Sequence, residues 1–171
     1  PYTGSGYLGA AIAMDKMLTK EMVKDKGVRT PAWKTFNAGA ITSEEDIVKS
    51  AHEIAAKIEA PCVVKTPTGG SSVGVYIVTS QDAVRPAVEK CLGFGPDILV
   101  EQMIEGREFT CAVLQDRALP SVEIVPKVDF YNYENKYKAG ATEEICPGRC
   151  TPEVEKQMGD MALKVHNRSE E

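Results

Sequence analysis

Apolar side chains recur along the chain with the period of a helix in four segments. Residues 42–60 show it most clearly: Ser43 is expected as the N-cap, acidic residues fill the first turn, and apolar residues line one face. Further helices are predicted over 12–26, ending at Gly27, and from Thr151 and Pro152 onward. A helix over 80–92 contains Pro86, which breaks a hydrogen bond there or marks a late start.

Short apolar runs bounded by turn residues predict strands between these helices. Pro31 disfavours helix just before it, so residues 30–38 are expected to be extended. Residues 129–150 have no clear period and are predicted to form a long loop, and loops of this length are usually functional or disordered. The predicted strands cover 61–65, 73–78, 98–104, 108–114 and 119–125.

Composition and charge narrow the partners of the 171-residue chain. Hydrophobic residues make up 43% and charged residues 26%, as in ordinary soluble domains. The net charge of −5 argues against nucleic acid or an anionic membrane as the main partner. No apolar run approaches the ~20 residues that a membrane helix needs, and no signal peptide is visible. The odd number of cysteines, five, fits free thiols, so we expect a cytoplasmic protein.

The loop in "KTPTGGSSVGVYIV", residues 65–78, is the first candidate for chemistry. Glycine lets the backbone approach a ligand closely, and backbone N–H groups and hydroxyls can hold an anion beside the charge of Lys65. It is not a Walker A loop, because the lysine precedes the glycines and a strand follows. The loop is expected either to cover a bound anion or to be an empty hairpin turn.

Two carboxylates and a tyrosine-rich segment are the other candidates. Glu101 lies in an otherwise apolar strand, where an unpaired charge is costly, and could accept a hydrogen bond from an exocyclic amine. Glu108 could accept from ribose hydroxyls, although both carboxylates could equally face solvent. The segment "FYNYENKYKAG" could be a lid that brings Lys136 to a phosphate and Tyr137 to a small polar substrate. A solvated basic loop is the alternative.

Several motifs, taken in order, resemble the D-alanine–D-alanine ligases of the ATP-grasp superfamily. They are "PYTGSG" with "AMDK", "VVKTPTGGSSVGV", "ILVEQMIEGREFT", "LPSVEI" and "FYNYENKYKAG", and the resemblance extends to about residue 166. It implies an α+β ATP-grasp fold, with a central lobe at 1–94 and part of a C-terminal lobe at 95–171. The family commonly has proline directly after the strand lysine, whereas Thr66 stands there before Pro67.

The resemblance also implies site residues. Lys16 and Lys65 resemble the pair that hold the ATP phosphates, and the loop serines resemble those that meet the terminal phosphate and the first D-alanine. The lid lysine resembles a ligand of the transferring phosphate, and the lid tyrosine bonds to a loop serine. The implied nucleotide-binding residues are Lys16, Lys65, Ser71, Glu101, Met103 through its backbone, Glu108 for the ribose, and Lys136. The implied catalytic residues are Ser71, Ser72, Lys136 and Tyr137.

The implied reaction is ATP-dependent ligation of two D-alanines through a D-alanyl phosphate, for peptidoglycan precursors. Mg²⁺ is implied as well, with its ligands expected in a family segment that follows the last helix, so no metal ligand is assigned here. The family's N-terminal domain is also not represented, and the 171 residues alone are expected not to make dipeptide. The resemblance leaves a homodimer open. The alternatives are a D-alanine–D-lactate or D-alanine–D-serine ligase, and a nucleotide-binding fragment without turnover.

Overall fold

The chain forms two compact units, each made of segments that are distant in sequence. The computed structural model describes residues 4–127 and 142–170. Unit 1 contains Pro1–Met14, Leu18–Thr30 and Glu105–Glu171, and unit 2 contains Asp15–Met17 and Pro31–Ile104. The sequence analysis placed the end of the first lobe near residue 94, whereas unit 2 continues to Ile104 because the strand after residue 94 pairs within its sheet.

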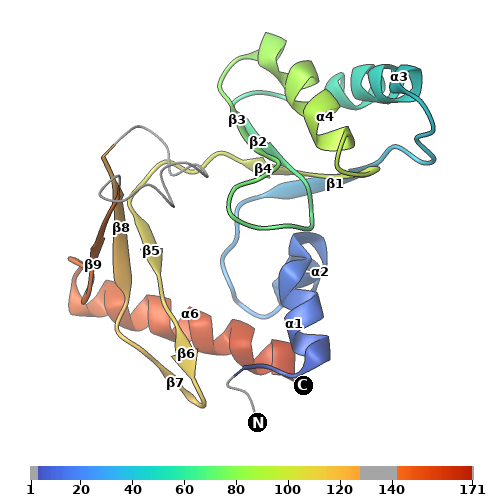
Figure 1. Cartoon of the computed structure of the whole chain (residues 1–171). Coiled ribbons are helices and arrows are strands. Elements are labelled where there is room, and N and C mark those ends of the chain that lie inside the picture. Colours follow the sequence, from blue (N-terminus) through green and yellow to red (C-terminus); the bar gives the residue numbers. More distant parts are fainter. Residues whose placement is uncertain (1–3, 128–141, 171) are drawn as a thin grey trace. The chain divides into compact units, whose positions relative to one another are not determined.

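Unit 2 is an antiparallel sheet with its helices on one face (Figure 1). The strand order is β1-β4-β2-β3, and helices α3 and α4 pack against each other over the sheet. The predicted strands on either side of the glycine-rich loop are confirmed as β2 and β3, which pair with each other. The elements are β1 (Trp33–Asn37), α3 (Glu44–Ala55), β2 (Cys62–Lys65), β3 (Val75–Val78), a 3-10 turn (Gln81–Ala83), α4 (Val84–Leu92) and β4 (Asp97–Gln102).

Alternation along the strands decides which side chains enter the core of unit 2. Successive side chains of a strand point to opposite faces of a sheet. Val64 and Val100 therefore face the helices and are buried there, together with Ile54, Val88 and Cys91 from the helices. Lys65 and Glu101 alternate with these valines along β2 and β4 and therefore lie on the face of the sheet opposite to α3 and α4.

Local signals at the helix starts of unit 2 are confirmed. Ser43 caps α3: its Oγ accepts a hydrogen bond from the Asp46 amide at 3.2 Å, and the Asp46 carboxylate accepts one from the Ser43 amide at 3.0 Å. Hydrogen bonds from Thr42 and Ser43 lower the pKa of Asp46. Pro86 marks a late helix start, since α4 begins at Val84 after the 3-10 turn and places this proline in its first turn.

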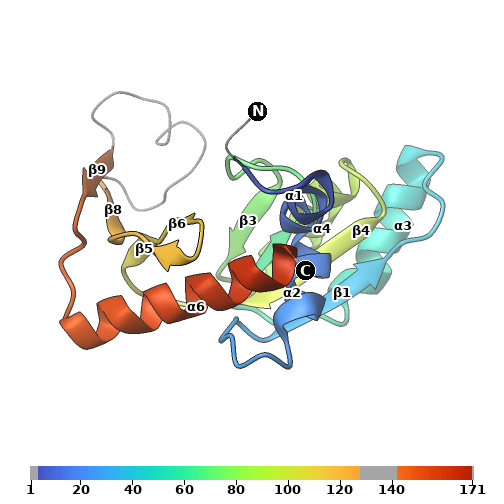
Figure 2. The same cartoon turned by 90° about the horizontal axis from the view of Figure 1, so that it is seen from below.

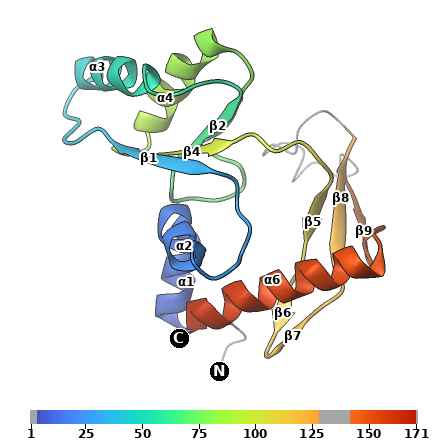
Figure 3. The same ribbon diagram turned by 180° about the vertical axis from the view of Figure 1, so that it is seen from behind.

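The described residues of unit 1 form a small antiparallel sheet, a hairpin and the helices α1, α2 and α6. The sheet has the order β5-β8-β9, and β6 pairs with β7. Helix α6 contacts the β6–β7 hairpin and α1 (Figures 2 and 3). The elements are α1 (Tyr7–Met14), α2 (Lys16–Val23, whose first two residues belong to unit 2), β5 (Glu108–Thr110), β6 (Val113–Leu114), β7 (Arg117–Ala118), β8 (Val122–Pro126), β9 (Thr142–Ile145) and α6 (Pro152–Glu170).

Three predicted elements differ in the structure. The single helix over 12–26 is wrong: helices α1 and α2 meet at Asp15, whose carboxylate accepts a hydrogen bond from the Met17 amide at 2.9 Å and so caps the second helix. The strand over 108–114 is divided into β5 and β6, which pair with different partners. Part of the predicted long loop is β9, which pairs with β8; residues 128–141 of that loop lie outside the described residues.

All five cysteines are free thiols, as the sequence analysis expected. Burial raises the pKa of the Cys91 thiol to about 12. Within the described ranges, no helix combines the length and the apolar character that crossing a membrane requires.

A buried carboxylate in β8 is held by two arginines. Glu123 has a side chain that is 3% exposed. One oxygen accepts from Arg107 Nε at 2.8 Å and Nη2 at 2.6 Å, and the other accepts from Arg149 Nε at 2.9 Å. The hydrogen bonds from Arg149, followed by those from Arg107, lower the pKa of Glu123 to about 2. This carboxyl therefore links the segment before β5 to the segment after β9.

The depressed pKa of Glu123 predicts a loss of stability in acid. Because the folded pKa, about 2, lies below the ordinary value of 4.5, the stabilisation is fully present above about pH 4.5 and is lost as the pH falls toward 2. Denaturant unfolding at a series of pH values should show this decline. We expect Glu123→Gln to lower the free energy of unfolding most at neutral pH, and the difference from the parent chain should shrink in acid. Glu53→Gln changes an exposed carboxylate of α3 and should have the same stability as the parent at each pH. A constant difference between Glu123→Gln and the parent across this range would contradict the assignment.

Candidate functional site

A lysine and a glutamate form an ion pair on the face of the unit 2 sheet opposite to α3 and α4. Lys65 ends β2, and Glu101 lies in the neighbouring strand β4. The register pairs Val63 with Glu101 and Lys65 with Leu99, so the two charged residues are diagonal neighbours on one face. Their side chains form a salt bridge and are only 17% and 9% exposed. Lys65 therefore supplies the opposite charge that a glutamate in this apolar strand requires.

Lys16, the first residue of α2, is the second cation of this group. Its backbone N–H donates to the carbonyl of Pro67 at 2.9 Å, and its Nζ donates to the carbonyls of Pro67 at 3.2 Å and Gly69 at 3.0 Å. Burial lowers the pKa of Lys16, and the charge of Lys65 lowers it further, while Asp15 and Glu101 act in the opposite direction. The two ammonium groups thus repel each other, and an anion bound between them would relieve that repulsion.

The loop that carries these carbonyls has an unusual backbone. Ser71 and Ser72 have φ values of 53° and 61°, in the left-handed region that residues with a Cβ seldom adopt. Such conformations cost on the order of 1–3 kcal/mol each, persist where the surrounding structure fixes them, and are found often at ligand clamps. The Thr66 amide donates to the Gly74 carbonyl at 3.0 Å, which closes the base of the loop. The loop therefore has a defined conformation beside Lys16.

Gly74 is required at the base of this loop. Its φ is +68°, and a Cβ at this position would lie 2.6 Å from Cγ2 of buried Thr66 and 3.4 Å from the Phe94 ring. The carbonyl of Gly74 also accepts a hydrogen bond from the Cys91 thiol at 3.7 Å. Backbone conformation and lack of space together explain glycine here.

The described residues bring together part of the predicted site. Unit 2 holds Lys16, Lys65, Glu101 and the loop with Ser71 and Ser72, and Met103 follows β4 in the same unit. Glu108 begins β5 in unit 1, opposite Ile124 of β8. Lys136 and Tyr137 lie outside the described residues, so their roles stay predictions.

Sequence reasoning missed several participants. Pro67 and Gly69 contribute only backbone carbonyls, which side-chain chemistry does not reveal. Trp33 of β1 lies opposite Glu101 in the sheet register. It is the single tryptophan of the sequence, and this rarity could have drawn attention to it as a site residue. Asp15 adjoins Lys16 and could have been recognised as the cap of a second helix.

In the part of the chain that the structure describes, no three or more His, Cys, Asp or Glu side chains are grouped so that they could hold a metal ion. The family resemblance implies magnesium ligands in a segment that follows the last helix, and the roles given below to the described residues do not involve the ion.

Comparison with known proteins assigns the family. Residues 22–169 match the model of the family described as D-ala D-ala ligase C-terminus. A D-alanine–D-alanine ligase of Xanthomonas axonopodis is 45% identical over 163 residues, covering 95% of this chain and 49% of that protein. The ligase of Desulforudis audaxviator is 38% identical over 170 residues, covering 97% of this chain and 53% of that protein. The chain thus spans about half the length of these relatives.

Solved structures agree with this assignment. The crystal structure of D-alanine–D-alanine ligase from Bacillus anthracis matches with a TM-score of 0.76 at 28% identity, covering 99% of this chain and 53% of that one. VanG D-Ala:D-Ser ligase from Enterococcus faecalis also matches with a TM-score of 0.76, at 27% identity, covering 99% of this chain and 48% of that one. The expected α+β ATP-grasp fold is confirmed. The chain belongs to the family of the D-alanine–D-alanine ligase C-terminus.

Proposed function

We propose that the protein containing this chain is an ATP-dependent D-alanine–D-alanine ligase that supplies dipeptide for peptidoglycan and so acts in cell wall biogenesis and cell shape. The observation that carries the proposal is the group formed by Lys16, Lys65 and Glu101 beside the strained serine loop. Two cations of reduced exposure beside one carboxylate leave a net positive charge, which favours an anionic ligand such as the phosphates of a nucleotide. The names of the relatives support ligation as the reaction.

Each residue of this group has a role in the proposal. Lys16 and Lys65 would bind the ATP phosphates. Glu101 would hold Lys65 in place and accept a hydrogen bond from the exocyclic amine of adenine, because a carboxylate has about four lone-pair sites. Ser71 and Ser72 would bind the terminal phosphate and the carboxyl group of the first D-alanine.

Four further residues of the proposal rest on the sequence motifs. Met103 would bind adenine through its backbone, and Glu108 would bind the ribose. Lys136 and Tyr137 would complete the closed site over the transferring phosphate. Lys136 would neutralise charge, and together with Tyr137 it would exclude water, because water would hydrolyse an acyl phosphate. ATP would supply the phosphoryl group that activates one D-alanine carboxylate for attack by the amine of the second.

The second amino acid or hydroxy acid is the open choice within the ligase class. The fold is shared with a D-Ala:D-Ser ligase as well as with D-alanine–D-alanine ligases. We favour D-alanine because tyrosine at position 137 resembles the residue of ligases that use it, whereas phenylalanine resembles those that use D-lactate. The cytoplasm as the location, Mg²⁺ as the accompanying cation and a homodimer as the assembly belong to the same proposal.

A chimera tests the proposed reaction. Residues 1–171 would replace the matching segment of the Xanthomonas axonopodis ligase, which is 45% identical. With ATP and Mg²⁺ present, we expect phosphate release that depends on D-alanine, and mass spectrometry should identify the dipeptide even when D-serine and D-lactate compete. The chain alone is the control and should release no phosphate above background.

Two outcomes would refute this proposal. A folded chimera that binds ATP but makes no D-alanyl product would exclude ligase activity and favour a nucleotide-binding function. A product that contains D-serine or D-lactate in preference to D-alanine would replace the proposed substrate.

A further inference from the structure

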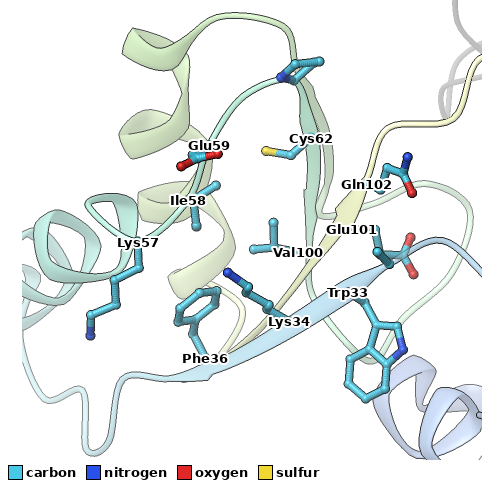
Figure 4. Close-up of a pocket in the computed structure, with 12 residues that line it drawn as sticks. Trp33, Lys34, Phe36, Lys57, Ile58, Glu59, Cys62, Val100, Glu101 and Gln102 are labelled. Atoms are coloured by element: carbon cyan, nitrogen blue, oxygen red, sulfur yellow. The ribbon is translucent and has the colours of Figure 1, made fainter.

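Unit 2 has a cavity of about 360 Å³ between its sheet and the segment that follows α3 (Figure 4). This volume lies within the range of small-molecule sites in proteins. The floor is apolar and largely buried, formed by Phe36, Ile58, Cys62 and Val100. The rim carries the polar side chains of Lys34, Lys57, Glu59 and Gln102.

The cavity lies on the face of the sheet opposite to the lysine–glutamate pair. Val100 of β4 belongs to the core on the helix side, and Glu101 follows it in the strand and points to the other face. Figure 4 shows Lys34 and Phe36 pointing toward the cavity, while the side chains of Trp33 and Glu101 point away from it. Glu101 contributes to the lining of the cavity, but its side chain pairs with Lys65, so the cavity and the site proposed for ATP use different faces of the same sheet.

The wall of this cavity is fixed by a hydrogen-bonded clamp. Gln81, from the turn before α4, donates through Nε2 to the carbonyl of Ile58 at 2.8 Å. Its Oε1 accepts from the amide of Ala60 at 3.1 Å. These two bonds hold the segment between α3 and β2, so the space is formed before any ligand enters, which reduces the ordering cost of binding.

The charges at the rim select the kind of ligand. Among the residues that the structure describes, the side chains of Lys34, Lys57, Glu59 and Gln102 make no hydrogen bond or ion pair. Two cations stand against one carboxylate, so the rim has a net positive charge above an apolar floor. The complementary ligand carries one negative charge on an apolar body.

We propose that this cavity is a second binding site that takes a small organic carboxylate with an apolar or aromatic body. The ring or branched chain would contact Phe36, Ile58 and Val100. Its carboxylate would bind Lys34 at the rim, with Lys57 adding positive charge and Gln102 a hydrogen-bond donor. The apolar floor separates this ligand class from the polyphosphate proposed for the opposite face, because a polyphosphate would leave Phe36, Ile58 and Val100 without an apolar partner.

Phenylacetate is a suitable probe, and phenylacetamide is its uncharged isostere. Each would be titrated into the ¹⁵N-labelled 171-residue chain while amide chemical shifts are followed. We expect saturable phenylacetate shifts at Ile58, Cys62 and Val100, with a dissociation constant of about 1 mM or below. Phenylacetamide should bind about tenfold more weakly. Lys34→Ala should reduce phenylacetate affinity about tenfold and leave phenylacetamide unchanged, since only the charged contact is removed.

Lys49→Ala is the matched control, because Lys49 is an exposed lysine of α3 that does not line the cavity. It should bind both probes like the parent chain. Lys57→Ala provides a second rim variant if Lys34→Ala alters the fold. The absence of saturable shifts at the floor residues, equal binding of the two probes, or shifts centred on Lys65 would overturn the proposal.

Discussion

Replacing Lys65 with methionine should destabilise the chain by about 3 kcal/mol, because it leaves the carboxylate of Glu101 buried without its partner. The pair is only 17% and 9% exposed, so water cannot take the place of the ammonium group without rearrangement of the sheet. Methionine keeps the length and the apolar part of the lysine side chain, which limits the loss of packing. Denaturant unfolding of the parent and the variant at neutral pH measures this free energy.

A double-mutant cycle separates the ion pair from other effects of the substitution. With Glu101→Gln present, Lys65→Met should cost only about 1 kcal/mol or less, since no buried charge then lacks a partner. The control is Lys24→Met, which removes an exposed ion pair with Glu21 and should change stability little. Equal costs of Lys65→Met with glutamate or glutamine at position 101 would show that the pair is not coupled.

The same substitution tests the proposed nucleotide site. If Lys65 binds a phosphate of ATP, its removal from the chimeric ligase should weaken ATP binding by about 2–3 kcal/mol, the value of a charged hydrogen bond. Calorimetry at a temperature where both proteins are folded keeps this loss distinct from instability. Unchanged affinity would remove Lys65 from the nucleotide site while leaving its structural role intact.

Replacing Gly74 with alanine should destabilise the chain by a similar amount, about 3 kcal/mol. A residue with a Cβ pays roughly 1–2 kcal/mol in the left-handed region, and overpacking adds about 1–3 kcal/mol. The added methyl group would meet Cγ2 of Thr66 at 2.6 Å, and Thr66 is buried and cannot move aside freely. Thermal or denaturant unfolding measures the change.

Variants of the same loop divide this cost into its two parts. Gly69→Ala should pay only the backbone part, because Gly69 has φ +97° and open space around it. Gly70→Ala should be nearly neutral, since its φ is ordinary and no atom lies within 4 Å. Thr66→Ser removes the methyl group that causes the clash and should recover part of the loss in Gly74→Ala. A Gly74→Ala variant as stable as Gly70→Ala would contradict this account.

The sequence was sufficient for elements whose signals are local. Ser43 with its acidic first turn identified the start of α3, and Thr151 with Pro152 identified the start of α6. The apolar runs around the glycine-rich loop identified β2 and β3, since both strands are buried against helices on one face. The ordered motifs then indicated the family and its fold.

Elements that depend on distant partners were not predictable in the same way. The segment that forms β9, Thr142–Ile145, reads "TEEI" and has little apolar character, so only its pairing with β8 makes it a strand. Lys65 and Glu101 were both identified as candidates, but their ion pair depends on the register between β2 and β4, which no local pattern determines. The break between α1 and α2 lies at Asp15, whose carboxylate accepts a hydrogen bond from the Met17 amide, a contact that no apolar period reveals.

The discontinuous make-up of the two units has a practical consequence for dissecting the molecule. The chain passes from one unit to the other after Met14, Met17, Thr30 and Ile104. A protease that cuts only after Ile104 would therefore leave the two units connected through the earlier passages, and a gene fragment covering 31–104 would encode the sheet without Lys16. Recombination that exchanges unit 2 between relatives must transfer the tripeptide Asp15–Met17 as well as the segment Pro31–Ile104. The candidate anion site is therefore encoded by two separate stretches of the gene, and both must be exchanged together.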